Sequence, residues 1–196
     1  YAPMYGVQIA FRNFSATRGI WGSRWVGLRH FERFFRSYYF VRLLTNTLNI
    51  SLYQLIVGFP IPIALAMMMN ELRGERYKKL VQSITYMPHF LSTVVIVSIL
   101  NSLLAPRAGI VNHLLRLLGR EPVYFMGEPN WFQHIYVWSG IWQNMGWNSI
   151  IYVAALTGID PTLYEAGHVD GASRWQMLWR ITLPSILPTA VIMLIL

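Results

Sequence analysis

The sequence predicts an all-α, polytopic membrane protein. Hydrophobic residues make up 55% of the 196 residues and charged residues only 12%, about half the charged share of a typical soluble domain. Apolar runs of spanning length recur at about 43–69, 80–104 and 131–156, and another begins at 184–196. Because a membrane helix needs about 20 residues, we expect the last helix to continue beyond the sequence, which therefore is predicted to be a fragment of a longer protein.

The predicted spans exclude several classes of protein. They contain no Asp or Glu and only two histidines, His89 and His134. An intramembrane enzyme would need paired acids, a His–Asp pair or a metal cluster, so we expect no catalytic, cofactor-binding or metal-binding residues. The chain also has no cysteine, which removes disulfides and thiol nucleophiles. A passive channel remains an alternative, because it would explain polar residues inside spans.

Residues 1–42 form an arginine-rich segment ahead of the first span. From about Val26 to Tyr39, aromatic residues recur at helical spacing with arginines between them. This pattern predicts an amphipathic helix along the membrane interface, in an extracytoplasmic segment. A nucleic-acid-binding patch is the weaker interpretation, because the segment leads directly into a span. The seven arginines are Arg12, Arg18, Arg24, Arg29, Arg33, Arg36 and Arg42.

Prolines interrupt the first two spans. Pro60 and Pro62 remove backbone hydrogen bonds and predict a bend, which requires neighbouring helices to cover the exposed carbonyls. Pro88 frees the carbonyl of Ile84 and predicts a hinge near the middle of the second span. The segments between spans are a short charged loop at 70–79 and a longer polar loop at 105–131.

Polar and aromatic residues within the predicted spans are spaced so that they form stripes along helix faces, and these residue types can bind a sugar. Aromatic faces can stack on the C–H side of a sugar, and amides can both donate to and accept from hydroxyls. The alternatives are amides that join neighbouring helices and an aromatic belt at the interface; for His89, the alternative is a satisfied interhelical donor. The predicted substrate-pathway residues are Asn46, Asn49, Tyr53, His89, Trp138, Trp142, Gln143, Asn144, Trp147 and Asn148.

A polar stretch at 160–184 separates the third span from the fourth. Its residues predict two short helices with a turn between them. Asp160 can cap the first helix with Pro161 at its first position, Gly171 supplies the break, and Ser173 or Asp170 can cap the second. Between two membrane spans, such a stretch must lie in water at a bilayer face.

That stretch resembles the EAA motif of permease subunits of bacterial ABC importers. The motif is Glu-Ala-Ala, three residues, Gly, nine residues, Ile, one residue, Leu-Pro. It is matched at Glu165, Ala166, Gly171, Ile181, Leu183 and Pro184. One position departs from the pattern, because Gly167 replaces the second Ala and loosens the helix by up to about 1 kcal/mol.

The resemblance extends over essentially the whole chain, to the polysaccharide and aldouronate branch of carbohydrate importer permeases, which includes alginate importers. It is visible in Pro3-Met4-Tyr5-Gly6, Gly19-Ile20-Trp21-Gly22-Ser23, Asn46-Thr47-Leu48 and Tyr86-Met87-Pro88-His89-Phe90. The resemblance implies a type I ABC importer permease fold of the six-helix type, in the bacterial cytoplasmic membrane. It also implies a second permease subunit, two cytoplasmic ATPases that hold ATP and Mg, an extracytoplasmic solute-binding protein and an oligosaccharide substrate.

The resemblance further implies a mechanical role for the polar stretch, in which each ATPase grips one EAA helix. Glu165 would meet a basic group of the ATPase, Gly171 would allow the close turn, and Trp175, Leu178 and Trp179 would make hydrophobic contacts. The complete set of predicted ATPase-coupling residues is Glu165, Ala166, Gly167, Asp170, Gly171, Ala172, Trp175, Leu178, Trp179, Ile181, Leu183 and Pro184.

Charge opposes the implied orientation. Ten Lys and Arg residues lie on the side of residues 1–42 and six on the side of the EAA stretch, so the positive-inside rule, naively applied, places that stretch outside. The resemblance requires it to face a cytoplasmic ATPase, and we follow the resemblance. The external arginines then either contact carboxylates of a uronate oligosaccharide or hold lipid phosphates or the binding protein.

Overall fold

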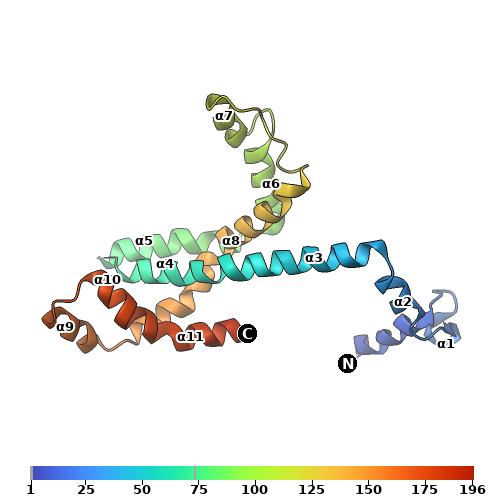
Figure 1. Ribbon diagram of the computed structural model, residues 1–196, viewed down its shortest axis with the longest axis horizontal. Coiled ribbons are helices and arrows are strands. Elements are labelled where there is room, and N and C mark those ends of the chain that lie inside the picture. Colours follow the sequence, from blue (N-terminus) through green and yellow to red (C-terminus); the bar gives the residue numbers. More distant parts are fainter. Residues whose placement is uncertain (1, 73) are drawn as a thin grey trace. The chain divides into compact units, whose positions relative to one another are not determined.

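The computed structural model describes residues 2–72 and 74–196 and is mostly helical (Figure 1). It divides between Asn49 and Ile50 into two compact units, which are described separately. Arg73, one of the six basic residues counted on the EAA side, lies outside the described residues. The predicted all-α class is confirmed, with one pair of two-residue strands in the described part of the chain.

The first unit begins with a 3-10 helix, η1 (Ala2–Phe11), followed by β1 (Arg12–Asn13), α1 (Gly19–Gly22) and β2 (Arg24–Trp25). The strands pair antiparallel with Arg12 opposite Trp25. The Arg12 guanidinium lies 5.6 Å from the ring centroid of Trp21 and 5.5 Å from that of Trp25, and its Nη1 donates to the Ser23 carbonyl at 3.1 Å. One arginine therefore joins both strands and α1 through cation–π and hydrogen-bond contacts.

The predicted amphipathic helix from Val26 to Tyr39 is wrong in its extent. The structure has a short α2 (Arg29–Phe35), a break, and then α3 (Tyr38–Tyr53). The Ser37 hydroxyl accepts a hydrogen bond from the Tyr39 N–H at 3.1 Å. Ser37 therefore caps α3, and this cap separates α3 from α2 within the predicted helix. The interfacial position of this segment stays a prediction.

The first long helix runs from Tyr38 to Asn70, so it begins before the predicted residue 43. It consists of α3, a π-helical turn η2 (Gln54–Gly58) and α4 (Pro60–Asn70). The wider turn lies directly before Pro60, which has no N–H to give and would crowd the carbonyl four residues earlier. The helix therefore accommodates Pro60 with a local π turn, where the sequence predicted a bend.

The second predicted span is a bent pair of helices. α5 (Glu75–Tyr86) leads through the 3-10 turn η3 (Met87–Phe90) to α6 (Thr93–Leu104), with a bend of 100° (Figure 1). The bend lies at the break formed by Leu91 and Ser92, three to four residues beyond Pro88, where the sequence predicts a hinge. The charged loop is shorter than the predicted 70–79, because α5 already begins at Glu75, whose negative charge suits a helix N-terminus.

The loop between α6 and α8 is organised by α7 (Ile110–Leu117) and by one buried amide. The Asn112 side chain is fully buried. Its Nδ2 donates to the carbonyls of Leu104, Ala105 and Val123 at 3.0–3.2 Å, and its Oδ1 accepts from the Val123 N–H at 2.7 Å. Asn112 thereby ties both ends of the loop to α7.

The long helix α8 (Pro129–Thr157) covers the third predicted span and packs against α4, α5 and α11 (Leu183–Ile195). Ala66, Met67, Tyr152, Leu156, Ile186 and Ala190 form the main buried cluster. By length and apolar composition, Tyr38–Asn70 and Arg174–Ile195 qualify as membrane-crossing helices, and the bent pair α5–α6 does so if counted as one span. Whether α8 itself crosses the membrane stays a prediction.

Candidate functional site

The polar stretch folds as the predicted pair of short helices, α9 (Pro161–Val169) and α10 (Arg174–Met177). Asp160 caps α9, since its Oδ1 accepts from the Thr162 N–H at 2.9 Å. This hydrogen bond to the ionised carboxylate lowers the pKa of Asp160 below its usual 3.8. Ser173, the first of the two predicted candidates, caps α10 and forms a reciprocal capping box with Gln176.

Gly171 makes the turn between α9 and α10. Its φ is +71°, which favours glycine. The Gly171 N–H donates to the His168 carbonyl at 3.1 Å, and the Ala172 N–H donates to the Gly167 carbonyl at 2.9 Å. These two bonds are those of a Schellman motif, which satisfies carbonyls at the end of α9.

Gly167, the residue that departs from the EAA pattern, lies where α9 approaches the next helix. A Cβ at this position would lie 3.2 Å from Met177 Sδ and 3.4 Å from Ile181 Cδ1. The missing methyl therefore permits a tighter contact than an alanine allows. The Tyr164 hydroxyl also lies 3.0 Å from the hydroxyl of the buried Thr182, and this hydrogen bond fastens α9 to the start of the last long helix.

The two helices enclose a groove of about 350 Å³. Six predicted coupling residues line it: Ala166, Gly167, Asp170, Gly171, Ala172 and Ile181. Leu163, Gln176, Met177 and Arg180 also line it and were not predicted. Glu165 and Pro184 lie outside the groove lining and are exposed. The groove is open, with Asp170 and Arg180 providing opposite charges at its wall.

Four further predicted coupling residues, Trp175, Leu178, Trp179 and Leu183, line another groove, of about 630 Å³, shared with α4. Trp175 and Trp179 meet edge to face at 5.7 Å and are 68% and 51% exposed. Leu178 and Leu183 line the same groove and also pack against the buried cluster. Ten of the twelve predicted residues are therefore split between two grooves beside α10 and the π turn η4 (Leu178–Thr182), and Glu165 and Pro184 line neither.

A polar cavity of about 790 Å³ lies between the π turn η2, α6 and α8. Its polar lining consists of Ser51, Gln54, Thr93, Tyr136, Ser139, Gln143, Asn144 and Asn148. Among the described residues that line it there is no Asp, Glu, Lys, Arg or His. The cavity thus offers neutral donors and acceptors, the groups that recognise hydroxyls.

Two of the cavity amides are bonded within the chain. Gln143 Nε2 donates to the Leu91 carbonyl at 3.0 Å. Asn144 Oδ1 lies 3.0 Å from His89 Nδ1, and the His89 ring stacks on Trp147 at 4.5 Å. The alternative of a satisfied interhelical histidine therefore describes His89 in this structure.

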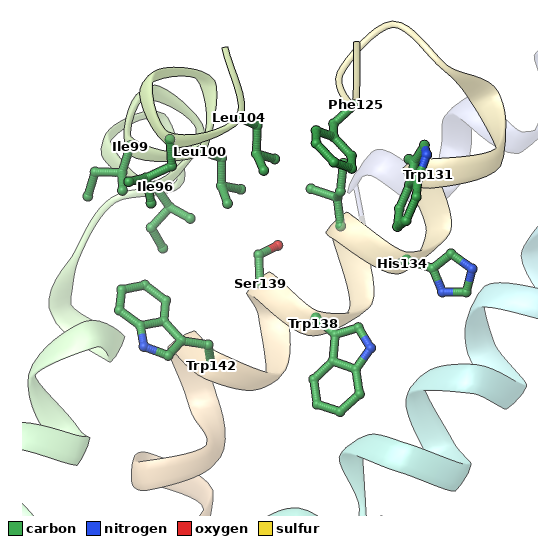
Figure 2. Close-up of a pocket in the computed structure, with 12 residues that line it drawn as sticks. Ile96, Ile99, Leu100, Leu104, Phe125, Trp131, His134, Trp138, Ser139 and Trp142 are labelled. Carbon is green, nitrogen blue, oxygen red and sulfur yellow. The ribbon is translucent and has the colours of Figure 1, made fainter. Parts of the chain in front are cut away.

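An apolar cavity of about 440 Å³ lies on another face of α8 (Figure 2). The predicted tryptophans Trp138 and Trp142 line this cavity and not the polar one. Trp138 Nε1 donates to the Tyr53 hydroxyl at 2.9 Å, and that hydroxyl lies 3.0 Å from His134 Nδ1. Tyr53 therefore belongs to an interhelical hydrogen-bonded chain.

The structure does not gather all the predicted pathway residues. Gln143, Asn144 and Asn148 share the polar cavity, whereas Asn46 and Asn49 belong to the first unit. Ser51, Gln54, Thr93, Tyr136 and Ser139 line the cavity and were missed. Gln54 could have been found from the sequence, because it is an amide within an apolar span, six positions before Pro60. The missed residues with hydroxyl groups could not, because they do not differ from ordinary helix residues.

Comparison with known proteins gives one family match. Residues 58–196 match the model of the binding-protein-dependent transport system inner membrane component. Over 196 residues the chain is 45% identical to the polygalacturonan/rhamnogalacturonan transport system permease protein YteP and 41% identical to protein LplB, both of Bacillus subtilis (strain 168). All of this chain is covered, but only 61% of YteP and 62% of LplB.

Solved structures agree in fold. The chain superposes with a TM-score of 0.90 and 45% identity on a chain in the crystal structure of a bacterial ABC transporter involved in the import of the acidic polysaccharide alginate. A second match, with a TM-score of 0.88 and 44% identity, is to the alginate transporter in complex with an alginate pentasaccharide-bound periplasmic protein. Each match covers 99% of this chain and 64% of the other.

Proposed function

The chain belongs to the binding-protein-dependent transport system inner membrane component family, and from this premise we propose that the whole protein is the permease subunit of an ATP-driven oligosaccharide importer. The chain spans about three fifths of the length of YteP and LplB. The proposed complex lies in the bacterial cytoplasmic membrane. It contains a second permease subunit, two cytoplasmic ATPases and an extracytoplasmic solute-binding protein.

The observation that supports this proposal best is the bonded helix–turn–helix of α9 and α10. Its turn is closed by two backbone hydrogen bonds, and Tyr164 fastens it to Thr182. If α9 and α10 are rigid, a displacement imposed on them is transmitted to the long helix that follows. In the proposed mechanism, ATP binding closes the ATPases, which move this element and tip the helices between inward-open and outward-open states.

The chain itself has no catalytic role in this proposal. ATP and Mg bind the partner ATPases, and this subunit binds neither. The exposed Glu165 carboxylate meets a basic group of one ATPase, and the groove lined by Ala166 and Gly171 receives an element of the same partner. Trp175 and Trp179, both more than half exposed, add the hydrophobic contact area.

The substrate proposed is an oligosaccharide that carries uronate carboxylates. YteP is named for polygalacturonan and rhamnogalacturonan transport, and the structural match imports the acidic polysaccharide alginate. The neutral polar cavity supplies partners for sugar hydroxyls. Carboxylates need charge-assisted contacts, and the arginines of residues 1–42, such as Arg18 and Arg29, are proposed to supply them on the extracytoplasmic side.

The coupling role is tested by Gly171→Asp, with Gly119→Asp as the matched control. Both glycines have φ near +70°, and neither would place a Cβ within 4 Å of another residue. The two substitutions therefore impose similar backbone strain, but only Gly171 lies in the proposed ATPase contact. We expect Gly171→Asp to abolish uptake in a subunit that still inserts, and Gly119→Asp to retain it; normal uptake by Gly171→Asp contradicts the proposal.

The substrate is tested with the reconstituted complex and a panel of neutral and acidic oligosaccharides. ATPase stimulation by uronate oligosaccharides, and not by neutral ones of equal length, is expected. Stimulation by neutral sugars alone refutes the uronate assignment and leaves the importer. Copurification without a stoichiometric ATPase, combined with ATP-independent flux, supports the passive channel instead.

A further inference from the structure

The bend between α5 and α6 leaves backbone groups without helical partners. Pro88 has no N–H, and the chain is extended at Leu91, with ψ of 136°. A carbonyl without a partner is costly in an apolar environment. The Gln143 carboxamide on α8 satisfies one such group, because its Nε2 donates to the Leu91 carbonyl at 3.0 Å.

His89, the third residue of η3, contacts α8 in two ways. Its ring lies parallel to the Trp147 indole, at 4.5 Å between centroids and 4° between planes. Its Nδ1 lies 3.0 Å from Asn144 Oδ1. Asn144 Nδ2 donates to the Gly140 carbonyl at 2.9 Å, so in this arrangement Oδ1 is the acceptor and the proton of the shared bond belongs to His89 Nδ1.

The backbones also approach closely at this place. A Cβ on Gly146 would lie 2.0 Å from the Thr85 carbonyl oxygen, so α8 lies directly against the last turn of α5. Gln143, Asn144, Gly146 and Trp147 are hereafter called the α8 clamp. They occupy little more than one helical turn and contact the chain on both sides of Pro88.

The clamp and the polar cavity share residues. Gln143 and Asn144 line the cavity, and so does Thr93, the first residue of α6. Asn144 keeps one amide hydrogen and one oxygen lone pair free after its bonds to His89 and Gly140. A ligand hydroxyl in the cavity can therefore meet an Asn144 amide whose orientation is already set by His89.

We propose that His89 is a positioning residue that fixes the angle of the α5–α6 bend and, at the same time, orients the Asn144 carboxamide toward the polar cavity. The imidazole stack holds η3 against α8, and the His89 hydrogen bond, together with the bond to the Gly140 carbonyl, selects one of the two amide orientations. The cavity wall and the bend consequently change together. The effect on transport rests on the proposed function, whereas the effect on the bend does not.

The bend is measured directly with spin labels. The 196 residues contain no cysteine, so Lys79→Cys on α5 and Asn101→Cys on α6, both exposed, introduce the two label sites of this segment, and any cysteine elsewhere in the assembled complex is first replaced by serine. Without substrate, we expect one narrow distance distribution. His89→Ala should broaden or shift it, and His113→Ala, on the exposed face of α7, should not. An unchanged distribution in His89→Ala overturns the proposal.

The orienting role is measured through the sugar dependence of ATPase stimulation in the same complexes. We expect His89→Ala to raise the half-maximal sugar concentration about tenfold, with the maximal rate much less affected. His89→Gln, which retains a side-chain N–H, should recover most of this loss, and His89→Phe, which retains only the ring, should not.

Asn144→Leu should raise the half-maximal sugar concentration as much as His89→Ala, and the double variant should add little to either. Additive losses, or equal recovery by Phe and Gln, contradict the orienting role. If the unsubstituted complex shows no sugar-stimulated ATPase, the proposed function fails while the distance measurement still decides the bend.

Discussion

Gly146→Ala should destabilise the contact between α8 and α5. The added methyl carbon would lie 2.0 Å from the Thr85 carbonyl oxygen, and ordinary contact begins at 3.4 Å, so the helices must separate by about 1.4 Å. Overpacking of this kind costs about 1–3 kcal/mol, and a backbone oxygen cannot rotate away, which favours the upper end. Alanine returns about 1 kcal/mol of helix propensity, which leaves a net loss of about 2 kcal/mol.

Gly140→Ala on the same helix is the control, because a Cβ there would meet nothing within 4 Å. It should gain about 1 kcal/mol from helix propensity alone. The measurement is the thermal unfolding midpoint of the full-length subunit in the assembled complex, followed by tryptophan fluorescence. At roughly 2–4 °C per kcal/mol, Gly146→Ala should unfold roughly 4–8 °C below the unsubstituted protein. Equal midpoints for the two variants refute the close approach at Thr85.

Three further predictions concern local contacts. Ser173→Ala removes the capping box of α10 and should cost about 1 kcal/mol, seen as faster amide hydrogen exchange in α10, whereas Ser185→Ala should leave it unchanged. The hydrogen bond from the Thr162 N–H lowers the pKa of Asp160 in the folded chain, so the ionised cap stabilises α9 above the pKa of the unfolded chain, and this stabilisation is lost as pH falls through the folded-state pKa. Amide hydrogen exchange in α9 should therefore accelerate below about pH 3.8. Asp160→Asn should remove the pH dependence of this exchange. Arg12→Lys loses the planar fork that contacts two indoles and a carbonyl and should speed trypsin cleavage after Arg18.

The sequence was sufficient where structure depends on near neighbours. Asp160, Gly171 and Ser173 act on backbone groups within three residues, so their residue types alone predict both helices and the turn. Pro88 predicted the bend of the second span only approximately, because the break lies three to four residues later, at Leu91 and Ser92. The π turns before Pro60 and Pro184 were not predictable from the sequence, because a helix can accommodate a proline by a bend, a break or a wider turn.

The sequence was insufficient where the partner is distant. Asn112 bonds Val123 and Leu104, and Arg12 packs on Trp21 and Trp25; nothing in the local pattern separates these residues from exposed ones. The amides of α8 could not be sorted either. Gln143 bonds the Leu91 carbonyl, and Asn144 bonds His89 and the Gly140 carbonyl, and only the folded chain shows which groups lie within reach.

The arrangement of rigid and adaptable segments determines where this chain can change shape. One hydrogen bond joins α9 to the last long helix, and the buried cluster around Tyr152 and Ile186 joins that helix to α4 and α8, so we expect a force on α9 to move these helices together. The regular α-helical bonding is interrupted at the two π turns and at η3. The turn η2 and the residues after η3 border the polar cavity, and His89 holds η3 to α8. In the proposed function, movement at 160–184 reaches the cavity as a change at these walls, and that is the coupling that alternating access requires.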